Sequence, residues 1–476
     1  MSNKKPLIVD LDGTVIFCDI LHESVLNVAK KSLKNFLKIP FYLFKGKAVL
    51  KKFLANNTDI DISLLPYNIE FLKWLKIQKN DGRKIVLCTG TDSHYANKIA
   101  SHLKLFDDVM ASDGVTNLTG KNKANALIKI YGEMGFDYAG NSFVDIEIWK
   151  ASYSSILVNC SRGLKKKVIK ISNVVEYFPK SKIGLKLFVK ALRVHQWLKN
   201  ILLFAPMIAA HMIGDLSAWK EVFIGFIAFS GCASSIYIIN DLLDLENDRS
   251  HPRKKHRPFA SGEMPYLFGI MLAPFLLTLS FIISSFLSMS FIVYLFIYLV
   301  ITTLYSFILK SLIIIDVITL GMLYTLRIIA GGAILSLPMS PWLLAFSIFL
   351  FISLAFIKRY AELEILDSNG SIEIKGRGYL VTDAPLIQTM GIASAFSAVM
   401  IFVLYLNSPE IIELYSSPEV IWLCIPILVF WQSWMWLCAH RGHMHDDPIV
   451  FAIKDRSSLI AGLLFIGVLF LGSLSF

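Results

Sequence analysis

Residues 237–262 read Tyr-Ile-Ile-Asn-Asp-Leu-Leu-Asp-Leu-Glu-Asn-Asp-Arg-Ser-His-Pro-Arg-Lys-Lys-His-Arg-Pro-Phe-Ala-Ser-Gly and follow an apolar run. On a helix, Asn240, Asp244 and Asp248 are spaced i, i+4, i+8 and share one face, with Asp241 at its edge. Carboxylates gathered on one face repel each other unless a cation joins them. An all-oxygen set of ligands suits Mg²⁺, whose shell substrate phosphates complete. The stretch therefore predicts a Mg²⁺–diphosphate site at a membrane surface.

The cations of the same stretch follow the carboxylates at once, at Arg249, Arg253, Lys254, Lys255 and Arg257. Guanidinium and ammonium groups bind phosphate oxygens, so we expect part of this run to hold the phosphates of a substrate. The alternative is a solvated acidic helix end followed by a positive loop on the inner side of a membrane. The alternation of acids and bases next to an apolar span favours the Mg²⁺–diphosphate site over this alternative.

Composition indicates a membrane protein with a large water-soluble part. The chain has 476 residues, of which 55% are apolar, and its mean hydropathy is +0.58, with the excess after about residue 190. The net charge of +11 gathers beside apolar segments, which favours anionic lipids and phosphorylated substrates and argues against nucleic acid as a partner. The six cysteines form no CxxC pair, which is typical of a reducing compartment or of burial.

The first 177 residues contain three apolar runs that end in polar or acidic side chains, at 7–14, 84–90 and 136–145. Helical patterns fill the gaps, which predicts a parallel α/β sheet with its site at the carboxyl ends of the strands. Residues 21–80 are expected to form a small helical cap over the site. Residues 41–54 of that cap have two interpretations. They form a plain cap helix, which is the preferred interpretation, or they lie against the membrane surface.

The Asp10-Leu-Asp12-Gly-Thr element, followed by the later motifs in order, resembles the haloacid dehalogenase (HAD) superfamily. The resemblance implies a Rossmann-like phosphatase in which Asp10 is the nucleophile that forms an aspartyl-phosphate and Asp12 is the general acid/base. It also implies that Thr89 binds phosphate, that Lys123 (or Lys121) neutralises the phosphoryl charge, and that Asp10, Asp12 and Asp145 hold Mg²⁺. A carboxylate attacks phosphorus only where metal and lysine offset the charge repulsion.

One position departs from the HAD pattern. The family usually carries Gly-Asp where this chain has Gly140-Asn141. The amide removes one charge from the metal side. Either the phosphatase is weakened, or the metal is held through the amide oxygen of Asn141 together with Asp145.

Residues 178–192 are a basic linker that we expect to lie on anionic lipid as a juxtamembrane helix. Residues 193–476 are expected to be an all-α membrane domain whose apolar segments mostly approach the ~20 residues that cross a bilayer core. Nine such segments recur, at 199–213, 220–240, 266–287, 289–309, 312–336, 341–357, 388–406, 419–438 and 457–475. With a cytoplasmic N-terminus, nine spans satisfy the positive-inside rule. We therefore expect a multi-pass protein of the inner (plasma) membrane.

Polar motifs lie at the inner ends of these segments. They are Arg193-Val-His-Gln196-Trp-Leu-Lys199-Asn, Tyr305-Ser-Phe-Ile-Leu-Lys310, Lys358-Arg359-Tyr-Ala-Glu362 and Arg377-Gly-Tyr379. Arg327 lies within the fifth segment, where an ionisable group is costly and is by default a functional candidate. Its alternative role is to pair with a helix carbonyl or a structural acid.

These motifs, together with NDxxDxxxD at 240–248 and HPxxKxRPxxxG at 251–262, resemble the UbiA superfamily of intramembrane prenyltransferases. The closest resemblance is to its polyprenyl-phosphate phosphoribosyltransferase branch. It implies helices around a cavity open to the cytosol, and transfer of 5-phosphoribosyl from phosphoribosyl pyrophosphate (PRPP) to a polyprenyl-phosphate lipid. The implied Mg²⁺ ligands are Asn240, Asp241, Asp244 and Asp248. The implied substrate-binding residues are Gln196, Lys199, Arg253, Lys254, Arg257, Tyr305, Lys310, Arg327, Lys358, Arg359, Glu362 and Tyr379.

A second acidic motif is not plainly present, and Glu362, Asp367 and Asp383 are the nearest acids. The phosphoribosyl product carries a 5-phosphate, which is a natural substrate for the fused phosphatase. An epimerase or glycosyltransferase would then act downstream on the lipid-linked sugar.

Two alternatives stay open. An aromatic prenyltransferase that uses a prenyl diphosphate, with a phosphatase of other substrate attached, shares the Mg²⁺–diphosphate chemistry. The extra cations favour sugar-phosphate transfer over it. A non-enzymatic transporter or scaffold with decayed sites would show no Mg²⁺-dependent turnover.

Overall fold

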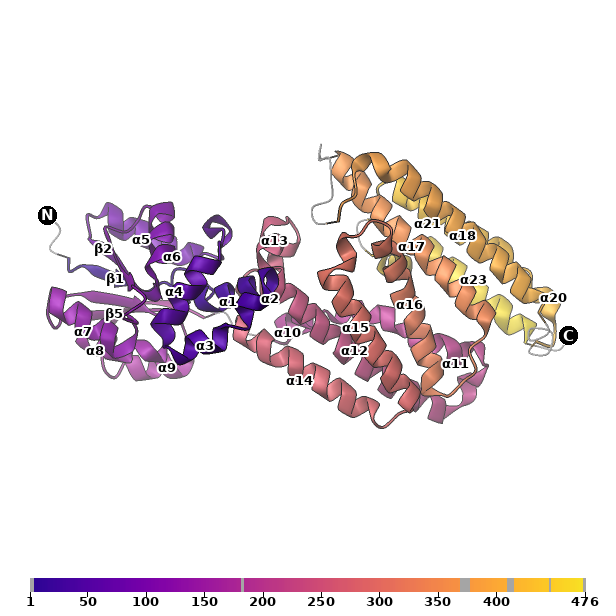
Figure 1. Cartoon of the computed structure of the whole chain (residues 1–476), viewed down its shortest axis with the longest axis horizontal. Coiled ribbons are helices and arrows are strands. Elements are labelled where there is room, and N and C mark those ends of the chain that lie inside the picture. The colour runs from indigo at the N-terminus through magenta and orange to yellow at the C-terminus, as the bar shows by residue number, and fades with distance from the viewer. Residues whose placement is uncertain (1–3, 181–183, 369–376, 409–414, 445–446, 474–476) are drawn as a thin grey trace. The chain divides into compact units, whose positions relative to one another are not determined.

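The computed structural model describes residues 4–180, 184–368, 377–408, 415–444 and 447–473 (Figure 1). The chain forms two compact units. One comprises Met1–Leu192 together with Tyr237–Ala273, and the other comprises Arg193–Ile236 together with Pro274–Phe476. The first unit therefore holds both the predicted α/β domain and the acidic-basic stretch of residues 237–262.

The first unit is built on a six-stranded parallel sheet in the order β3-β2-β1-β4-β5-β6. The strands are β1 Leu7–Val9, β2 Ile85–Asp92, β3 Asp108–Ser112, β4 Asp137–Gly140, β5 Ser154–Cys160 and β6 Val174–Pro179. Because β1 pairs with β2 on one side and β4 on the other, the carboxyl ends of these three strands meet where the strand order reverses. The predicted parallel α/β sheet is confirmed, and its three predicted strands are the three central ones.

Helices cover both faces of this sheet and form the cap. Figure 1 shows α5 and α6 on one side and α7, α8 and α9 on the other. The helices of the first unit are α1 Ile20–Lys31, α2 Leu33–Phe36, α3 Ile39–Phe44, α4 Lys47–Asn57, η1 Ile62–Leu64, α5 Ile69–Asn80, α6 Ser93–Leu103, α7 Gly120–Tyr131, η2 Phe143–Asp145, α8 Ile146–Ala151, α9 Arg162–Val168, α10 Leu185–Ala191, α13 Leu245–Ser250 and η5 Lys254–His256. The cap consists of α1 to α4, within residues 20–57. Helix α5, which lies inside the expected cap range of 21–80, covers a face of the sheet instead.

The described part of the second unit consists of helices and their connections. Two of these helices, α12 Leu216–Leu243 and α14 Tyr266–Ser284, contain residues of both units. The others are η3 Val194–Phe204, α11 Ala205–Ala209, η4 Met212–Gly214, α15 Met289–Phe307, η6 Leu309–Ser311, α16 Ile315–Ile334, α17 Pro341–Ser368, η7 Val381–Asp383, α18 Ala384–Leu406, α20 Pro418–Ile421, α21 Cys424–His440, α22 Pro448–Lys454 and α23 Arg456–Gly472.

Seven stretches in the described residues are long and apolar enough to cross a membrane, so the predicted count of nine is not confirmed. The first predicted span, 199–213, is divided between the 3₁₀ turns of η3 and the short helix α11. Pro206 cannot donate to a preceding turn, and His211 takes a left-handed conformation at φ 57°, so a long helix cannot run through them. The last, 457–475, is represented by α23, which is apolar but shorter than the others.

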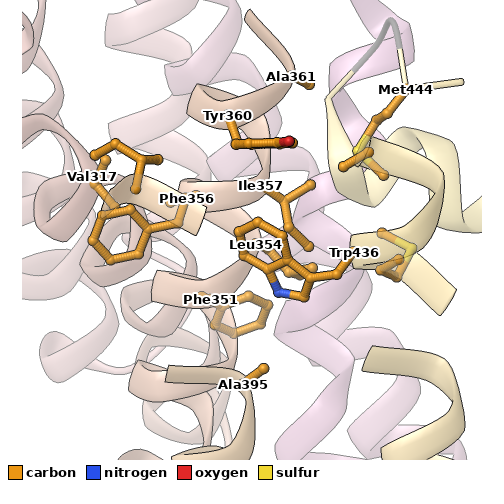
Figure 2. Close-up of a cluster of buried hydrophobic side chains, with 14 of the residues drawn as sticks. Val317, Phe351, Leu354, Phe356, Ile357, Tyr360, Ala361, Ala395, Trp436 and Met444 are labelled. Atoms are coloured by element: carbon orange, nitrogen blue, oxygen red, sulfur yellow. The ribbon is translucent and has the colours of Figure 1, made fainter. Parts of the chain in front are cut away.

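The core of the second unit lies around α17 (Figure 2). Phe351, Leu354 and Ile357 of this helix are buried there with Trp436 of α21. A Cβ on Gly391 of α18 would lie 2.2 Å from the Trp436 ring, so only glycine allows this close approach. This packing fixes the helices that carry the basic side chains described below.

Candidate active sites

The first site lies at the carboxyl end of β1. Asp10 follows that strand, and the Lys123 ammonium of α7 donates to its Oδ1 at 2.7 Å. Lys123 is buried, whereas Lys121 is exposed, so the structure places Lys123 rather than Lys121 on the carboxylate. Lys123 also donates to the Tyr138 hydroxyl at 2.8 Å. Asp10 therefore carries a buried, fixed counter-charge, which a nucleophilic carboxylate needs when it approaches a phosphate.

Asp145 is held by the loop that follows β4. Its carboxylate accepts hydrogen bonds from the Tyr138 hydroxyl at 2.9 Å and from the amides of Asn141 and Ser142 at 3.2 and 2.9 Å. The Asn141 side chain packs against Gly13, where a Cβ would lie 1.9 Å from its Nδ2 and where φ is +72°. Only glycine combines that backbone conformation with that closeness. Asp10, Lys123, Tyr138 and Asp145 are thus joined in one hydrogen-bonded chain.

Asp12 faces the same site. Its carboxylate accepts the Thr91 hydroxyl at 2.5 Å and the amide of Ile20, the first residue of α1, at 2.9 Å. Burial, reinforced by the charge of Asp19, raises the pKa of Asp12 to about 7. Burial also raises the pKa of Asp10, to about 6, although Lys123 opposes the shift. A carboxyl with a pKa near neutrality can both give and take a proton, which is what a general acid/base requires.

Thr91 and Lys51 were missed by the sequence prediction. Thr89 is fully buried, and its hydroxyl accepts the amide of Thr91 at 3.1 Å, whereas Thr91 lines the cavity. The sequence Thr89-Gly90-Thr91 contains two hydroxyl groups and does not show which of them faces the site. The structure decides this, because β2 continues to Asp92. Lys51 comes from the cap helix α4 and donates to the Gly90 carbonyl at 2.5 Å. Burial lowers its pKa. Nothing in the sequence distinguishes it from the other cap lysines.

These groups line a cavity of about 650 Å³. One wall is formed by Ser261–Leu267, the segment that leads from the acidic-basic stretch into α14, and Lys51 of the cap also lines it. The oxygen donors of Asp10, Asp12, Asn141 and Asp145 all border this cavity and suit Mg²⁺ by their chemistry. Within the described ranges, no group of three or more His, Cys, Asp or Glu side chains converges as a ready metal site.

The acidic motif of the first unit is bound to cations of the same unit. Helix α12 ends at Leu243, and Asp244 is the residue before α13. The Arg257 guanidinium donates to Asp241 at 3.1 Å and to both oxygens of Asp248 at 2.8 and 2.6 Å. Asp244 instead accepts Lys30 of α1 at 2.8 Å. The structure therefore brings Asp241 and Asp248 onto one cation, whereas the sequence grouped Asp244 and Asp248 with Asn240.

The remaining predicted residues of this stretch lie close by in sequence. Asn240 is half-buried in the last turn of α12, and Arg253 and Lys254 are exposed. The carboxylate oxygens of Asp241 and Asp248 suit Mg²⁺ by their chemistry, and in this structure the guanidinium of Arg257 binds both side chains.

In the second unit, Asp447 gathers two of the predicted lysines. It accepts Lys199 at 2.7 Å and Lys358 at 3.4 Å on the same oxygen, and the Tyr324 hydroxyl at 3.1 Å. Burial alone would raise the pKa of Asp447, but Lys199 and Lys358 hold it below its usual range. Asp447 also caps α22 by accepting the amide of Ile449 at 3.3 Å. Lys199 and Lys358, 159 positions apart in the sequence, thus meet at one carboxylate.

A second cluster of the same unit surrounds Asp316. The carboxylate is fully buried, forms an ion pair with Arg359 at 2.9 Å and accepts the Tyr379 hydroxyl, and Arg377 lies 3.6 Å from it. Glu362 also binds Arg359. Sequence reasoning missed Asp316, although an acid at the start of an apolar segment is a signal that could have found it.

Of the acids proposed for the second acidic motif, Glu362 alone is placed in this cation cluster by the described contacts. Asp383 accepts the amide of Leu380 at 2.9 Å, and the side chain of Asp367 lies outside the described residues.

Arg327 pairs with a helix carbonyl, as in the alternative considered for it, and its role in substrate binding stays a prediction. Its guanidinium donates to Asn200 at 2.9 Å, to the carbonyl of Leu323 one turn earlier, and to the Tyr298 hydroxyl at 3.3 Å. Its carbon centre also lies 5.1 Å from the centroid of the Tyr298 ring. The side chain thus holds η3, α15 and α16 together.

The other predicted residues of the second unit occupy the ends of its helices. Tyr305 in α15 accepts Arg377 at 3.3 Å, Lys310 belongs to η6, and Gln196 is half-buried in η3.

Removal of Asp316 tests the importance of its cluster for stability. Asp316→Ala leaves the fully buried Arg359 without its buried partner, which typically costs about 3–5 kcal/mol of unfolding free energy. We expect a large fall in Tm of the purified protein in detergent, whereas Asp383→Ala, which removes one half-exposed carboxylate, serves as the control with a small effect. An unchanged Tm for Asp316→Ala would contradict this role.

The family model described as the UbiA prenyltransferase family matches residues 201–451, which is more than half of the chain. The chain belongs to this family. This UbiA-family chain is 37% identical over 465 residues to y4nM, an uncharacterized protein of Sinorhizobium fredii, covering 97% of this chain and 90% of that one. That relative therefore shares both the α/β part and the membrane part.

Two further relatives of this UbiA-family chain carry informative descriptions. It is 32% identical to the nodulation protein NoeC of Azorhizobium caulinodans, over 61% of this chain and 95% of that one. It is 29% identical to the decaprenyl-phosphate phosphoribosyltransferase of Mycolicibacterium smegmatis, over 59% and 90% of the two chains.

Two solved structures are similar to parts of the UbiA-family chain. A UbiA homologue from Archaeoglobus fulgidus bound to GPP and Mg²⁺ is 18% identical, covers 60% of this chain and 98% of its own, and has a TM-score of 0.46. A substrate-bound phosphoserine phosphatase is 19% identical over 40% of this chain and 99% of its own, with a TM-score of 0.27. The chain is a multi-pass membrane transferase of the UbiA family with an N-terminal parallel α/β domain.

Proposed function

We propose that this UbiA-family protein transfers 5-phosphoribosyl from PRPP to a polyprenyl-phosphate, in a Mg²⁺-dependent reaction on the cytoplasmic side of the inner membrane. The observation that carries the proposal is the number of cations gathered on buried acids. A diphosphate leaving group alone needs few of them, whereas a sugar that also bears a 5-phosphate needs more. Lys199 and Lys358 share Asp447, and Arg359 and Arg377 share Asp316. The relative from Mycolicibacterium smegmatis that is described as a phosphoribosyltransferase points the same way.

In the proposed transfer, a phosphate oxygen of the lipid attacks the anomeric carbon of PRPP. The bond from that carbon to the pyrophosphate oxygen breaks, and pyrophosphate leaves with the electron pair. No protein nucleophile is needed, because the protein contributes by orienting the two substrates and by stabilising charge on the leaving group. Asp241 and Asp248 would hold the Mg²⁺ that neutralises the diphosphate, in the place where Arg257 now binds them.

We further propose that the HAD domain removes the 5-phosphate from the lipid product. The Asp10 carboxylate attacks phosphorus, and Asp12 donates its proton to the departing sugar oxygen. Water, deprotonated by Asp12, then releases phosphate from the aspartyl-phosphate. Lys123, 2.7 Å from Asp10, offsets the negative charge that builds up in both steps. The product would be polyprenyl-phosphoryl-ribose, a substrate for a downstream epimerase or glycosyltransferase.

The proposal is tested with purified protein in detergent, Mg²⁺, a polyprenyl-phosphate and PRPP, following the lipid products by mass. We expect a phosphoribosyl-lipid that later loses one phosphate, and EDTA should stop its formation. A phosphoribosyl-lipid that persists would keep the transferase and assign the phosphatase another substrate. If PRPP gives no lipid product while a prenyl diphosphate and an aromatic acid react, the proposed transfer is wrong and the protein is an aromatic prenyltransferase.

A further inference from the structure

The cap of the first unit has an inner apolar face that is already covered. Val28 of α1 and Leu50 and Leu54 of α4 form a small buried cluster, and Ile39 and Tyr42 of α3 pack against it. The Tyr42 ring stacks on Phe53, with centroids 3.9 Å apart. The cap therefore needs no further apolar contact on this side to fold.

The outer surface of the cap around α2 and α3 is apolar and exposed. Leu33 of α2 is 69% exposed, Leu37 is 70%, and Phe41 and Phe44 of α3 are 59% and 92% exposed. Single exposed apolar residues are ordinary, but several large ones within twelve consecutive residues indicate a surface that contacts something. We call Leu33, Leu37, Phe41 and Phe44 the outer cap face.

The charge around the outer cap face has one sign. Between Glu23 and Asp59 the sequence contains eight lysines and no acidic residue. Lys34, Lys38 and Lys45 are exposed among the outer apolar side chains. Large apolar groups flanked by lysines are the pattern of a segment that lies in the interface of an anionic bilayer. An apolar contact with another protein would not require such an excess of positive charge.

The start of the cap is also tied to the ends of two candidate membrane spans. Glu23 of α1 forms a buried, bidentate ion pair with Arg249 at 2.6 and 3.0 Å, and accepts the hydroxyl of Tyr266, the first residue of α14, at 3.2 Å. Lys30, near the end of α1, donates to Asp244, which directly follows α12. Both α12 and α14 are long and apolar enough to cross a membrane. Helix α2 begins two residues after α1 ends, so the outer cap face starts close to the point where these spans end.

We propose that the outer cap face binds the surface of the bilayer. The four apolar side chains insert among the lipid head groups and the first carbons of the acyl chains, and the lysines bind anionic lipid phosphates. The proposal does not depend on the identity of either substrate. It gives the basic-apolar stretch of the cap a function beyond that of a plain cap helix.

Binding of the cap to the bilayer would also affect the phosphatase activity proposed above, on which this step rests. The cavity lies under the cap and is walled in part by Ser261–Leu267, which leads into α14. With the cap on the bilayer, a phosphate group carried by a membrane lipid reaches Asp10 without leaving the membrane surface. The phosphatase would then prefer a lipid-linked phosphate ester to a soluble one.

The test uses the full chain in lipid nanodiscs, with Phe44→Cys labelled by an environment-sensitive fluorophore. The six native cysteines are buried, so the introduced thiol is the one that reacts, and unlabelled wild type serves as the blank. Val115→Cys is the matched control, because Val115 is 87% exposed in the same unit but outside the cap. We expect the label at 44 to be shielded from aqueous iodide and quenched by spin-labelled lipid, and the label at 115 to show the reverse. Replacing anionic by zwitterionic lipid should weaken the shielding.

Two results would overturn the proposal. One is equal iodide quenching at positions 44 and 115 in anionic nanodiscs. The other is shielding at 44 that persists in detergent and grows with protein concentration, which would assign the face to a second copy of the chain.

A double variant provides a readout that does not depend on labelling. Leu37→Ser with Phe44→Ser changes two exposed side chains, so folding should be unaffected. We expect kcat/KM for a lipid-linked phosphate ester to fall about tenfold, with no change for a soluble aryl phosphate. Equal loss on both substrates would contradict a membrane role.

Discussion

Replacing Asp10 by Asn is expected to abolish removal of the 5-phosphate while the phosphoribosyl-lipid still forms. The amide has the same shape as the carboxylate but cannot attack phosphorus, so no aspartyl-phosphate forms. Loss of a covalent nucleophile typically lowers the rate by at least about 10³-fold. The phosphorylated lipid should therefore accumulate, and mass analysis of the extracted lipid should show one species where wild type shows two.

Two lysines of α7 provide matched controls for the Asp10 result. Lys123→Met removes the ammonium that lies 2.7 Å from Asp10, whereas Lys121→Met removes an exposed charge two residues away. We expect the first to reproduce the loss of phosphatase activity and the second to leave it intact. Release of 5-phosphate by Asp10→Asn at the wild-type rate would refute the proposed phosphatase. It would leave the transferase unaffected, because the two products are measured separately.

The parallel sheet and the residues on its central strands could be predicted from sequence because their signals are local. An apolar run followed by a turn and a carboxylate marks the end of a strand, and parallel strands bring such ends together. Asp10, Asp12 and Lys123 accordingly lie together at one edge of the sheet. Seven of the nine predicted membrane spans correspond to long apolar helices in the described residues, whereas η3 and α11 divide the first and α23 is shorter than the others.

The pairings between distant residues could not be predicted in this way. Glu23 and Arg249 are 226 positions apart, and each alone reads as an ordinary charged residue. Lys199 and Lys358 were predicted as phosphate ligands, but Asp447, which holds both, was not among the predicted site residues. The exposed outer cap face was also ambiguous, because an amphipathic sequence does not show which of its faces is already covered. Such facts depend on tertiary contacts, and only the folded chain supplies them.

In the acidic motif, replacing Asp248 by Asn is expected to slow phosphoribosyl transfer by about 10²–10³-fold. Asp248 is buried and binds Arg257 through both oxygens, at 2.8 and 2.6 Å, while Asp241 binds the same guanidinium at 3.1 Å. Removing one charge from this pair should weaken its hold on Mg²⁺–diphosphate. We therefore also expect the Mg²⁺ concentration for half-maximal rate to rise.

The matched control for Asp248→Asn is Glu246→Gln, which makes the same change of charge two residues away in α13. If the transferase depends on the carboxylate pair that Arg257 joins, the control should retain most of its activity. Both variants should hydrolyse a soluble aryl phosphate at the wild-type rate, because Asp10 and Lys123 are untouched. Equal transfer rates for Asp248→Asn and Glu246→Gln would show that the motif acts only through its overall negative charge. Diphosphate binding would then have to be assigned to the cations gathered on Asp447 and Asp316.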